Sequence, residues 1–124
     1  MIEKANQRNE SIVVEGVHLD VKYLQKMMQK YPSCIPFILH IKSKNKHGER
    51  FAVRAKHMTI DPRFNKYVSS LKQIRTIQDY LVKNSEEVLI PRIENHNVDR
   101  SVSLIQTTVM RCLHRIMQGE KLYD

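Results

Sequence analysis

The chain has 124 residues and carries 21 Lys and Arg against 13 Asp and Glu, which gives a formal net charge of +8. A chain of this length fits one domain, and such a domain can bury roughly two-thirds of its unfolded surface. The positive charge favours a phosphate-bearing partner: a nucleotide, a phosphorylated metabolite, nucleic acid or an anionic membrane surface. Charge alone does not choose among these.

Cysteine content and hydropathy indicate the cellular compartment in which the protein is expected. The two cysteines are Cys34 and Cys112, and no apolar signal segment stands at the start. We therefore expect free thiols in an intracellular, cytoplasmic protein and not a secreted disulfide scaffold. No apolar run approaches the roughly 20 residues that cross a bilayer. We expect no membrane partner.

The first half of the chain predicts two strands with a helix between them. Residues 11–16, SIVVEG, contain consecutive β-branched residues, which is typical of a strand covered on both faces. The sequence LDVKYLQKMMQKYP then predicts a helix, with Asp20 as its N-cap and Pro32 at its end. The run CIPFILHIKS predicts a second buried strand.

Two helices are predicted next. The first runs over about residues 46–58, despite Gly48 near its start. The second begins with Asp61 as N-cap and Pro62 at the first helical position, where the missing N–H of proline would have no partner in any case. Its apolar residues keep helical spacing to about residue 83.

The last elements complete an alternating pattern. Residues 88–93, VLIPRI, predict a third strand, and Asn97 is the predicted N-cap of an amphipathic helix. The alternation of strands and helices predicts one domain over residues 1–124, of the α/β class, with a parallel sheet between two layers of helices. Three strands make a small sheet, and each is apolar enough to need neighbours on both sides.

A candidate site follows the first predicted strand. Ligands of parallel sheets gather at the carboxyl ends of the strands, where Glu15, Gly16 and His18 would lie. Glu15 could hold Mg²⁺ through water or orient a nucleophile, and it could equally be an exposed loop carboxylate. Gly16 would let a phosphate ligand approach closely or only make the turn. His18 is a candidate substrate contact or a loop histidine. The histidines and cysteines lack the spacing of a zinc site.

A second candidate site is a cationic helix face. Four side chains share one face of the predicted helix 46–58: His47, Arg50, Arg54 and His57. The basic surface continues on the following helix, with Lys66, Lys72 and Arg75. Arginine suits the clamping of a phosphoryl group because its planar fork donates two parallel hydrogen bonds. A solvated basic surface is the default interpretation of such a charge run.

The chain also resembles a known family. Five segments are similar to the carboxy-terminal half of the 2-phosphoglycerate kinase-like P-loop proteins, and among these to the plant low-phytic-acid proteins: SIVVEGVHL, IPFILHI, ERFAVRAKHMTIDPRFNKY, IRTIQDYL and NVDRSV. The likeness runs from about Asn9 to Asp124. It implies a three-layer parallel-sheet P-loop kinase-like fold that uses ATP and Mg²⁺. It also implies that Glu15 is the acid at the end of a strand and that Arg50 and Arg54 belong to a lid, a segment that closes on the phosphates.

One sequence motif of these P-loop proteins is missing from the chain. The phosphate-binding motif G-x-x-x-x-G-K-[ST] is absent, and the three glycines are widely separated. The resemblance therefore implies that residues 1–124 are the carboxy-terminal portion of an incomplete P-loop kinase-like domain, with three strands and about four to five helices. We expect the chain alone to be inactive and to bind neither ATP nor Mg²⁺ tightly. The implied partners are a phosphorylated small molecule and the missing amino-terminal half or a second copy.

Two functions remain open. The chain could belong to a small-molecule kinase that acts on 2-phosphoglycerate or in inositol phosphate (phytic acid) metabolism, supplying Glu15 as acid and the arginine lid, with Lys66 and Arg75 as further phosphate contacts. It could instead be a non-catalytic module that binds a polyanion through its basic helices. Nucleic acid is the weaker form of that alternative, because no recognition motif is present and aromatic residues are not interleaved with the basic ones.

Overall fold

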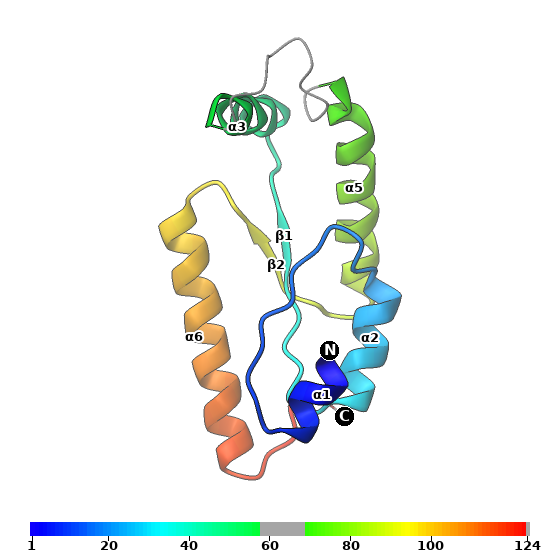
Figure 1. Cartoon of the computed structure of the whole chain (residues 1–124), viewed down its shortest axis with the longest axis vertical. Coiled ribbons are helices and arrows are strands. Elements are labelled where there is room, and N and C mark those ends of the chain that lie inside the picture. The colour runs from blue at the N-terminus through cyan, green and yellow to red at the C-terminus, as the bar shows by residue number, and fades with distance from the viewer. Residues whose placement is uncertain (58–68, 124) are drawn as a thin grey trace.

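The computed structural model describes residues 1–57 and 69–123. Within these residues the chain is α/β, with a two-stranded parallel sheet and five helices, which confirms the predicted class and the number of helices. The elements in chain order are α1 (Ile2–Gln7), α2 (Val21–Lys30), β1 (Ile38–His40), α3 (Lys44–His57), α5 (Leu71–Glu87), β2 (Arg92–Glu94) and α6 (Val98–Met117) (Figure 1).

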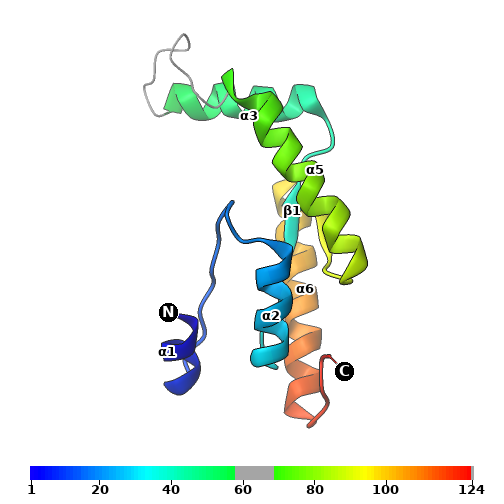
Figure 2. The same ribbon diagram turned by 90° about the vertical axis from the view of Figure 1, so that its right-hand side faces the viewer.

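The two strands lie between layers of helices. β1 and β2 run parallel, with Ile38 opposite Arg92 and His40 opposite Glu94. Helix α6 lies on one side of the sheet, and α2 and α5 lie on the other (Figure 1). Helix α3 lies across the end of the sheet where the strands finish (Figure 2). Arg50 of α3 donates to carbonyls just beyond β2, which joins this helix to the end of the sheet.

The apolar core lies on the side of α2 and α5. Its buried centre consists of Val21 from α2, Ile38 from β1 and Ile90 from the turn before β2. Partly buried apolar residues pack around this centre: Leu24, Met28, Leu81, Val82 and Val88. Burying one such side chain contributes about 1.5–3 kcal/mol to stability. Its members all precede α6 in the chain.

Helix α6 is amphipathic, as predicted, but much of its apolar surface is open. Six of its apolar side chains are exposed: Val98, Val102, Leu104, Met110, Leu113 and Met117. Its amino-terminal cap agrees with the prediction, because the side chain of Asn97 accepts a hydrogen bond from the backbone N–H of Arg100 at 3.0 Å. The local signals that start this helix are thus satisfied, and in the described part of the chain the helix packs against the short strand β2.

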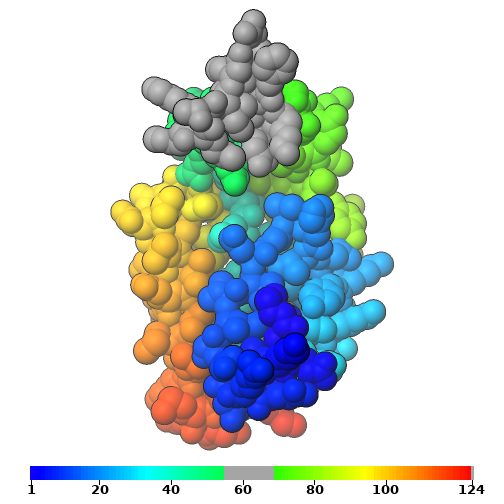
Figure 3. All heavy atoms as spheres, viewed as in Figure 1, coloured from blue at the N-terminus to red at the C-terminus, as the bar shows by residue number. Residues whose placement is uncertain are grey.

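The predicted first strand is not formed. Residues 11–16 adopt no regular structure, and Val13 is 96 % exposed. They run beside the sheet without joining it (Figure 2) and lie on the surface (Figure 3). A strand needs a neighbouring strand to pair its N–H and C=O groups, and β1 and β2 are the two strands in the described part of the chain. The expectation of three strands was therefore wrong for these residues.

The other strands are shorter than predicted. β1 lies inside the run CIPFILHIKS, but Leu39 is 52 % exposed, so β1 is not covered on both faces as expected. β2 begins after Pro91, because the residues before it form the turn that ends α5. In that turn the N–H of Ile90 donates to the carbonyl of Ser85 at 3.2 Å, and Leu89 adopts a left-handed backbone with φ of 56°. This geometry is that of a Schellman motif.

Three further differences concern helix ends and chain ends. Helix α1 was not predicted. Asp20 precedes α2 as expected but makes no cap with its side chain; its Oδ1 accepts from the Tyr80 hydroxyl at 3.3 Å. The predicted helix start at Asp61 and Pro62 lies outside the described residues, and the helix that follows continues to Glu87.

The carboxyl end folds back on the loop after α2. The Tyr123 hydroxyl donates to the carbonyl of Cys34 at 2.6 Å. Burial, with smaller contributions from Cys34 and Cys112, raises the pKa of Tyr123 to about 12. This contact closes a loop across most of the chain. Within residues 1–57 and 69–123, no helix is long and apolar enough to span a bilayer.

Candidate functional site

Polar side chains from α3 and α5 converge on the carboxyl ends of β1 and β2. We call this set the strand-end cluster. It comprises the side chains of His47, Arg50, Arg75 and Gln78 and the backbone groups of Ile41, Lys42, Asn95 and His96 that they contact. This edge of a parallel sheet is where ligands most often bind.

Gln78 extends the hydrogen bonding of β1 by one residue. The N–H of Ile41 donates to Gln78 Oε1 at 2.9 Å, and Gln78 Nε2 donates to the carbonyl of Ile41 at 2.9 Å. A neighbouring strand would offer one acceptor and one donor in the same way. The side chain of α5 therefore takes the place of a strand at this position.

Two arginines close their forks on backbone carbonyls. Arg75 donates to the carbonyl of Ile41 at 2.9 Å and to that of Lys42 at 2.7 Å, just beyond β1. Arg50 donates to the carbonyl of Asn95, and to that of His96 at 2.9 Å, just beyond β2. Each guanidinium thus holds one strand end through two bonds. A fork that fits two carboxylate or phosphate oxygens here meets neutral acceptors.

His47 lies buried between these arginines and is 7 % exposed. Its Nδ1 is 3.3 Å from Arg75 Nη1, and its ring lies 4.7 Å from that of Phe51, tilted by 38°. Burial is the largest cause that lowers the pKa of His47, followed by the charges of Arg75 and Arg50. His47 is therefore neutral at pH 7, with Nδ1 free to accept a hydrogen bond.

A carboxylate stands at the end of β2. Glu94 lies opposite His40 in the sheet, and its Oε2 is 3.9 Å from Lys42 Nζ. Burial lowers the pKa of His40, and the charge of Glu94 partly opposes this shift. Beyond the strand, Asn95 Oδ1 accepts from the Ser101 hydroxyl at 2.8 Å. The strand end thus carries an acid as well as cations.

The predicted site residues fall into two groups. Arg50 and Arg75 meet at the strand-end cluster, and Arg54 lies one turn further along α3 with an exposed side chain. Glu15, Gly16 and His18 are exposed on the loop before α2 and are not members of this cluster. Lys66 lies outside the described residues.

The loop that carries His18 borders an open hollow of about 280 Å³. The hollow is lined by Val17, His18 and Asp20 from the loop, and by Ile77, Tyr80 and Leu81 from α5. His18 therefore lies against the middle of α5, whereas Arg75 and Gln78 bind the strand end from the same helix. In the described residues, no group of three His, Cys, Asp or Glu side chains could hold a metal ion. The role of Glu15 as a magnesium ligand stays a prediction.

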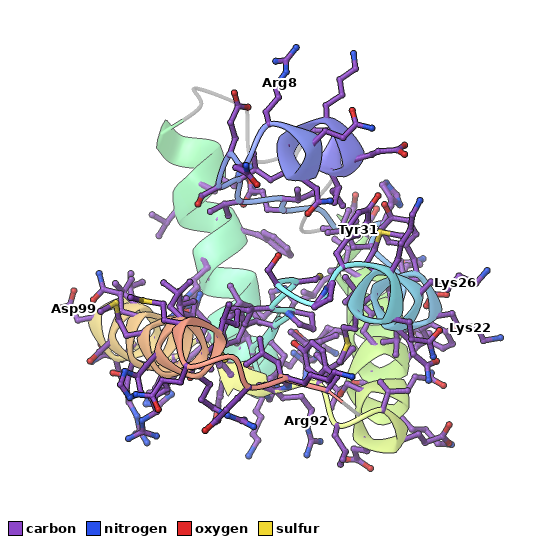
Figure 4. The ribbon with its side chains drawn as sticks, turned by 90° about the horizontal axis from the view of Figure 1, so that it is seen from below. Arg8, Lys22, Lys26, Tyr31, Arg92 and Asp99 are labelled. Carbon is purple, nitrogen blue, oxygen red and sulfur yellow. The ribbon has the colours of Figure 1, made fainter. Side chains whose placement is uncertain are left out.

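Other basic side chains lie outside the strand-end cluster. Lys22 and Lys26 project outward from α2 (Figure 4), and both are exposed. Arg92 is paired with Glu86, with Nη1 and Oε1 2.7 Å apart. These side chains have the surroundings of a solvated basic surface.

Sequence reasoning missed three members of this region: Gln78, Glu94 and Asn95. Glu94 had the same signal as Glu15, an acid directly after an apolar run, here VLIPRI. Gln78 had a different one. It lies four residues after Ile74 and three before Leu81, so it is a polar residue on the inward face of an amphipathic helix. Such a residue must find a hydrogen-bonding partner inside the protein.

Comparisons of the amino-acid sequence with known proteins indicate a distant relationship to 2-phosphoglycerate kinases. No protein-family model matches the chain, and no solved structure matches it. An uncharacterised protein of Dictyostelium discoideum is 46% identical over 125 residues, which cover all of this chain and 15% of that protein. The 2-phosphoglycerate kinase of Methanopyrus kandleri is 29% identical over 110 residues, which cover 89% of this chain and 33% of the kinase.

A second kinase gives the same result over a longer match. The 2-phosphoglycerate kinase of Pyrococcus furiosus is 25% identical over 122 residues, which cover 98% of this chain and 39% of the kinase. The chain thus spans between 15 and 39% of the length of these three relatives. Over most of its own length, the chain is a distant homologue of proteins named 2-phosphoglycerate kinase.

Proposed function

We propose that residues 1–124 form the carboxy-terminal part of an ATP- and Mg²⁺-dependent small-molecule kinase with a P-loop kinase-like fold. The observation that carries this proposal is the similarity to 2-phosphoglycerate kinases over most of the chain. The chain lacks a G-x-x-x-x-G-K-[ST] motif, so it would supply the strand ends and the cationic helix face while another part of a longer protein supplies the phosphate loop.

The state of the apolar run at residues 11–16 supports this assignment. Ile12 and Val13 are exposed, although their β-branched side chains suit a buried strand. In the described residues β1 pairs with β2, and Gln78 meets its other edge only beyond the strand, at Ile41. A strand inserted between β1 and residues 11–16 would pair with both. We assign that position to the strand that precedes the phosphate loop.

Insertion of this strand would give the loop residues their roles. Glu15 would then follow a paired strand and could hold Mg²⁺ through water, as kinases of this kind require. Gly16 would allow the phosphates to approach the backbone, and His18 would contact the substrate. The phosphoryl acceptor would be a phosphorylated small molecule, with 2-phosphoglycerate first and an inositol phosphate second.

The basic side chains of the two candidate sites would contact phosphate in two different ways. Arg54 and Lys66 would contact the transferred phosphoryl group from the lid. Arg50 and Arg75 already donate to strand-end carbonyls, so each would bind phosphate only by exchanging those acceptors. A phosphate oxygen is the stronger acceptor because it carries charge.

A chimera tests the proposal. The amino-terminal part of the Methanopyrus kandleri kinase is joined to residues 1–124, and ATP-dependent phosphorylation of 2-phosphoglycerate and of inositol phosphates is measured. We expect turnover by the chimera, none by residues 1–124 alone, and none after Glu15→Gln. Arg54→Lys should lower turnover by about a hundred- to a thousand-fold, as for other positioned transition-state contacts.

The control is Lys72→Arg on α5, which keeps the charge of an exposed side chain. Its turnover should match that of the parent chimera. A folded chimera, shown by a cooperative thermal transition, that phosphorylates neither acceptor would overturn the proposal. Activity of residues 1–124 alone that is lost with Glu15→Gln would overturn the assignment of a missing part.

The alternative is a non-catalytic module that binds a polyanion through its basic helices, and the exposed Lys22 and Lys26 of α2, a helix without acidic residues, are further basic side chains that could take part. It predicts that residues 1–124 alone bind inositol hexakisphosphate and that Lys22→Gln combined with Lys26→Gln weakens binding. Calorimetry on the isolated chain measures this directly. Binding that survives both substitutions would exclude this surface.

A further inference from the structure

His47 is held as a hydrogen-bond acceptor inside a set of donors. Arg75 Nη1 lies 3.3 Å from His47 Nδ1 and also donates to the carbonyl of Ile41 at 2.9 Å. Because Arg75 can only donate, His47 must accept at Nδ1 and carry its single ring proton on Nε2. The bond therefore exists only with the neutral imidazole.

The charges around His47 are positive. Arg75 faces it from α5, and Arg50 faces it from its own helix α3. Lys42, at the end of β1, is within ion-pair distance of Glu94 at the end of β2. The positions that follow β2, Asn95 and His96, offer backbone carbonyls, and these are bound by Arg50.

Protonation would reverse the contact between His47 and Arg75. Nδ1 would become a donor, two cations would stand at hydrogen-bond distance, and Coulomb repulsion would replace the hydrogen bond. The ring of Phe51 also lies against that of His47, which limits the space into which the imidazolium could turn. Arg75 is the side chain that can leave, since its other partners are carbonyls at the protein edge.

We propose that His47 is a pH-sensitive latch for the strand-end cluster: the neutral ring holds Arg75 on the carbonyls of Ile41 and Lys42, and the protonated ring releases it. Release removes two of the bonds that join α5 to the end of β1 and leaves Gln78 to hold Ile41 alone. Unperturbed histidine changes charge near pH 6.5, and burial, followed by the charges of Arg75 and Arg50, lowers the pKa of His47, so release falls on the acid side of that value. This inference is independent of the proposed kinase function.

The test is nuclear magnetic resonance on the full chain of residues 1–124 between pH 8 and pH 5. Two signals are followed: the ring nitrogens of His47, and the hydrogen-exchange protection of the Ile41 amide, corrected for the intrinsic pH dependence of exchange. We expect Nε2 to be protonated and Nδ1 to be a bare acceptor at pH 8. As His47 gains its second proton, the hydrogen-exchange protection of the Ile41 amide should fall by about tenfold or more. A tenfold change is the change in equilibrium constant that corresponds to a shift of one pKa unit.

His47→Asn separates the latch from general acid loosening. Asparagine places an oxygen where Nδ1 lies and cannot be protonated, so Ile41 should stay protected at pH 5. His40→Asn is the matched control, because His40 is the neighbouring histidine whose pKa burial also lowers; this variant should keep the pH dependence. The amide of Tyr31, bonded to the carbonyl of Met27 at 2.8 Å, lies at the carboxyl end of α2 and should not change.

Three results would overturn the latch. The first is a proton on Nδ1 at pH 8. The second is protection at Ile41 that does not change while His47 becomes protonated. The third is a pH dependence that persists in His47→Asn or disappears in His40→Asn. The first two are measured on the unmodified chain and therefore decide the matter even where His47→Asn fails to fold.

Discussion

The side chain of Gln78 should contribute measurably to stability because it replaces a strand. In Gln78→Ala the N–H of Ile41 loses its acceptor at 2.9 Å, whereas the carbonyl of Ile41 keeps Arg75 as a donor. The cost therefore comes mainly from the N–H. A buried donor left without a partner costs about 1–3 kcal/mol, and we expect about 1–2 kcal/mol here because the site is only partly buried and water can reach it.

Urea unfolding followed by circular dichroism measures this change, with equal dependence on urea as the check that unfolding remains comparable. Gln73→Ala is the matched control, since Gln73 is exposed on the same helix and the substitution changes helix propensity by the same amount. Gln78→Glu should fall between the two. It keeps an acceptor for the Ile41 N–H and loses the donor to the Ile41 carbonyl.

A small difference in unfolding free energy between Gln78→Ala and Gln73→Ala would refute the expected contribution of Gln78 to stability. If Gln78→Ala and Gln73→Ala agree within about 0.5 kcal/mol, which is the usual range for surface substitutions, the pair of bonds to Ile41 has no net value. If Gln78→Glu is as costly as Gln78→Ala, the acceptor is not the important half of the amide.

Three further substitutions test separate parts of the fold by urea unfolding. Leu89→Gly should raise the free energy of unfolding by about 1 kcal/mol, because Leu89 has φ of 56° and a left-handed backbone costs a side chain about 1–2 kcal/mol; Leu89→Ala should bring no such gain. Asn97→Ala should lower it by about 1 kcal/mol through loss of the cap on α6, and Asn97→Asp should restore most of it. Tyr123→Phe should lower it by about 1 kcal/mol at pH 7. Folding raises the pKa of Tyr123 to about 12, so the folded state keeps the proton longer than an unfolded tyrosine near pH 10 does. The stability that Tyr123 provides is therefore complete below about pH 10 and lost as pH rises toward 12. Equal alkaline profiles for Tyr123→Phe and the parent would contradict that assignment.

Self-association is the remaining prediction. The exposed apolar residues of α6 and the unpaired run at residues 11–16 should make the isolated chain associate as its concentration rises. Sedimentation velocity measures this, and Val13→Thr combined with Leu113→Gln should reduce it. A monodisperse monomer at every concentration would show that these surfaces need no cover.

Helices were predictable from the sequence because their signals are local. The repeat of apolar residues in α2, α5 and α6 extends over ten or more residues, and the cap at Asn97 depends on groups within three positions. Strands were less predictable because pairing depends on distant residues. The run Ile12, Val13 and Val14 has the composition of a strand, but composition supplies no neighbour.

The site was predictable in its chemistry and not in its contacts. The sequence placed Arg50 and Arg75 on one basic surface, and both lie at the carboxyl ends of the strands. Their acceptors are backbone carbonyls, 45 and 34 residues away in the chain for Asn95 and Ile41. Every residue has a carbonyl, so no residue type marks such an acceptor in the sequence. A phosphate-binding role and a strand-holding role are therefore indistinguishable from the arginines alone.

These two roles compete in the folded protein. A guanidinium that donates both ends of its fork to carbonyls cannot also bind a phosphate in bidentate fashion, so Arg50 and Arg75 each hold either a strand end or an anion. Phosphate binding at these residues would then free carbonyls beyond β1 and β2, and the affinity for phosphate would be reduced by the stability of the closed cluster. Protonation of His47 opens the Arg75 half of the cluster and leaves the Arg50 half closed. Anion binding through Arg75 should for this reason be stronger below the pKa of His47 than above it, whereas binding through Arg50, whose charge lowers the pKa of His47 less than that of Arg75 does, should depend less on pH.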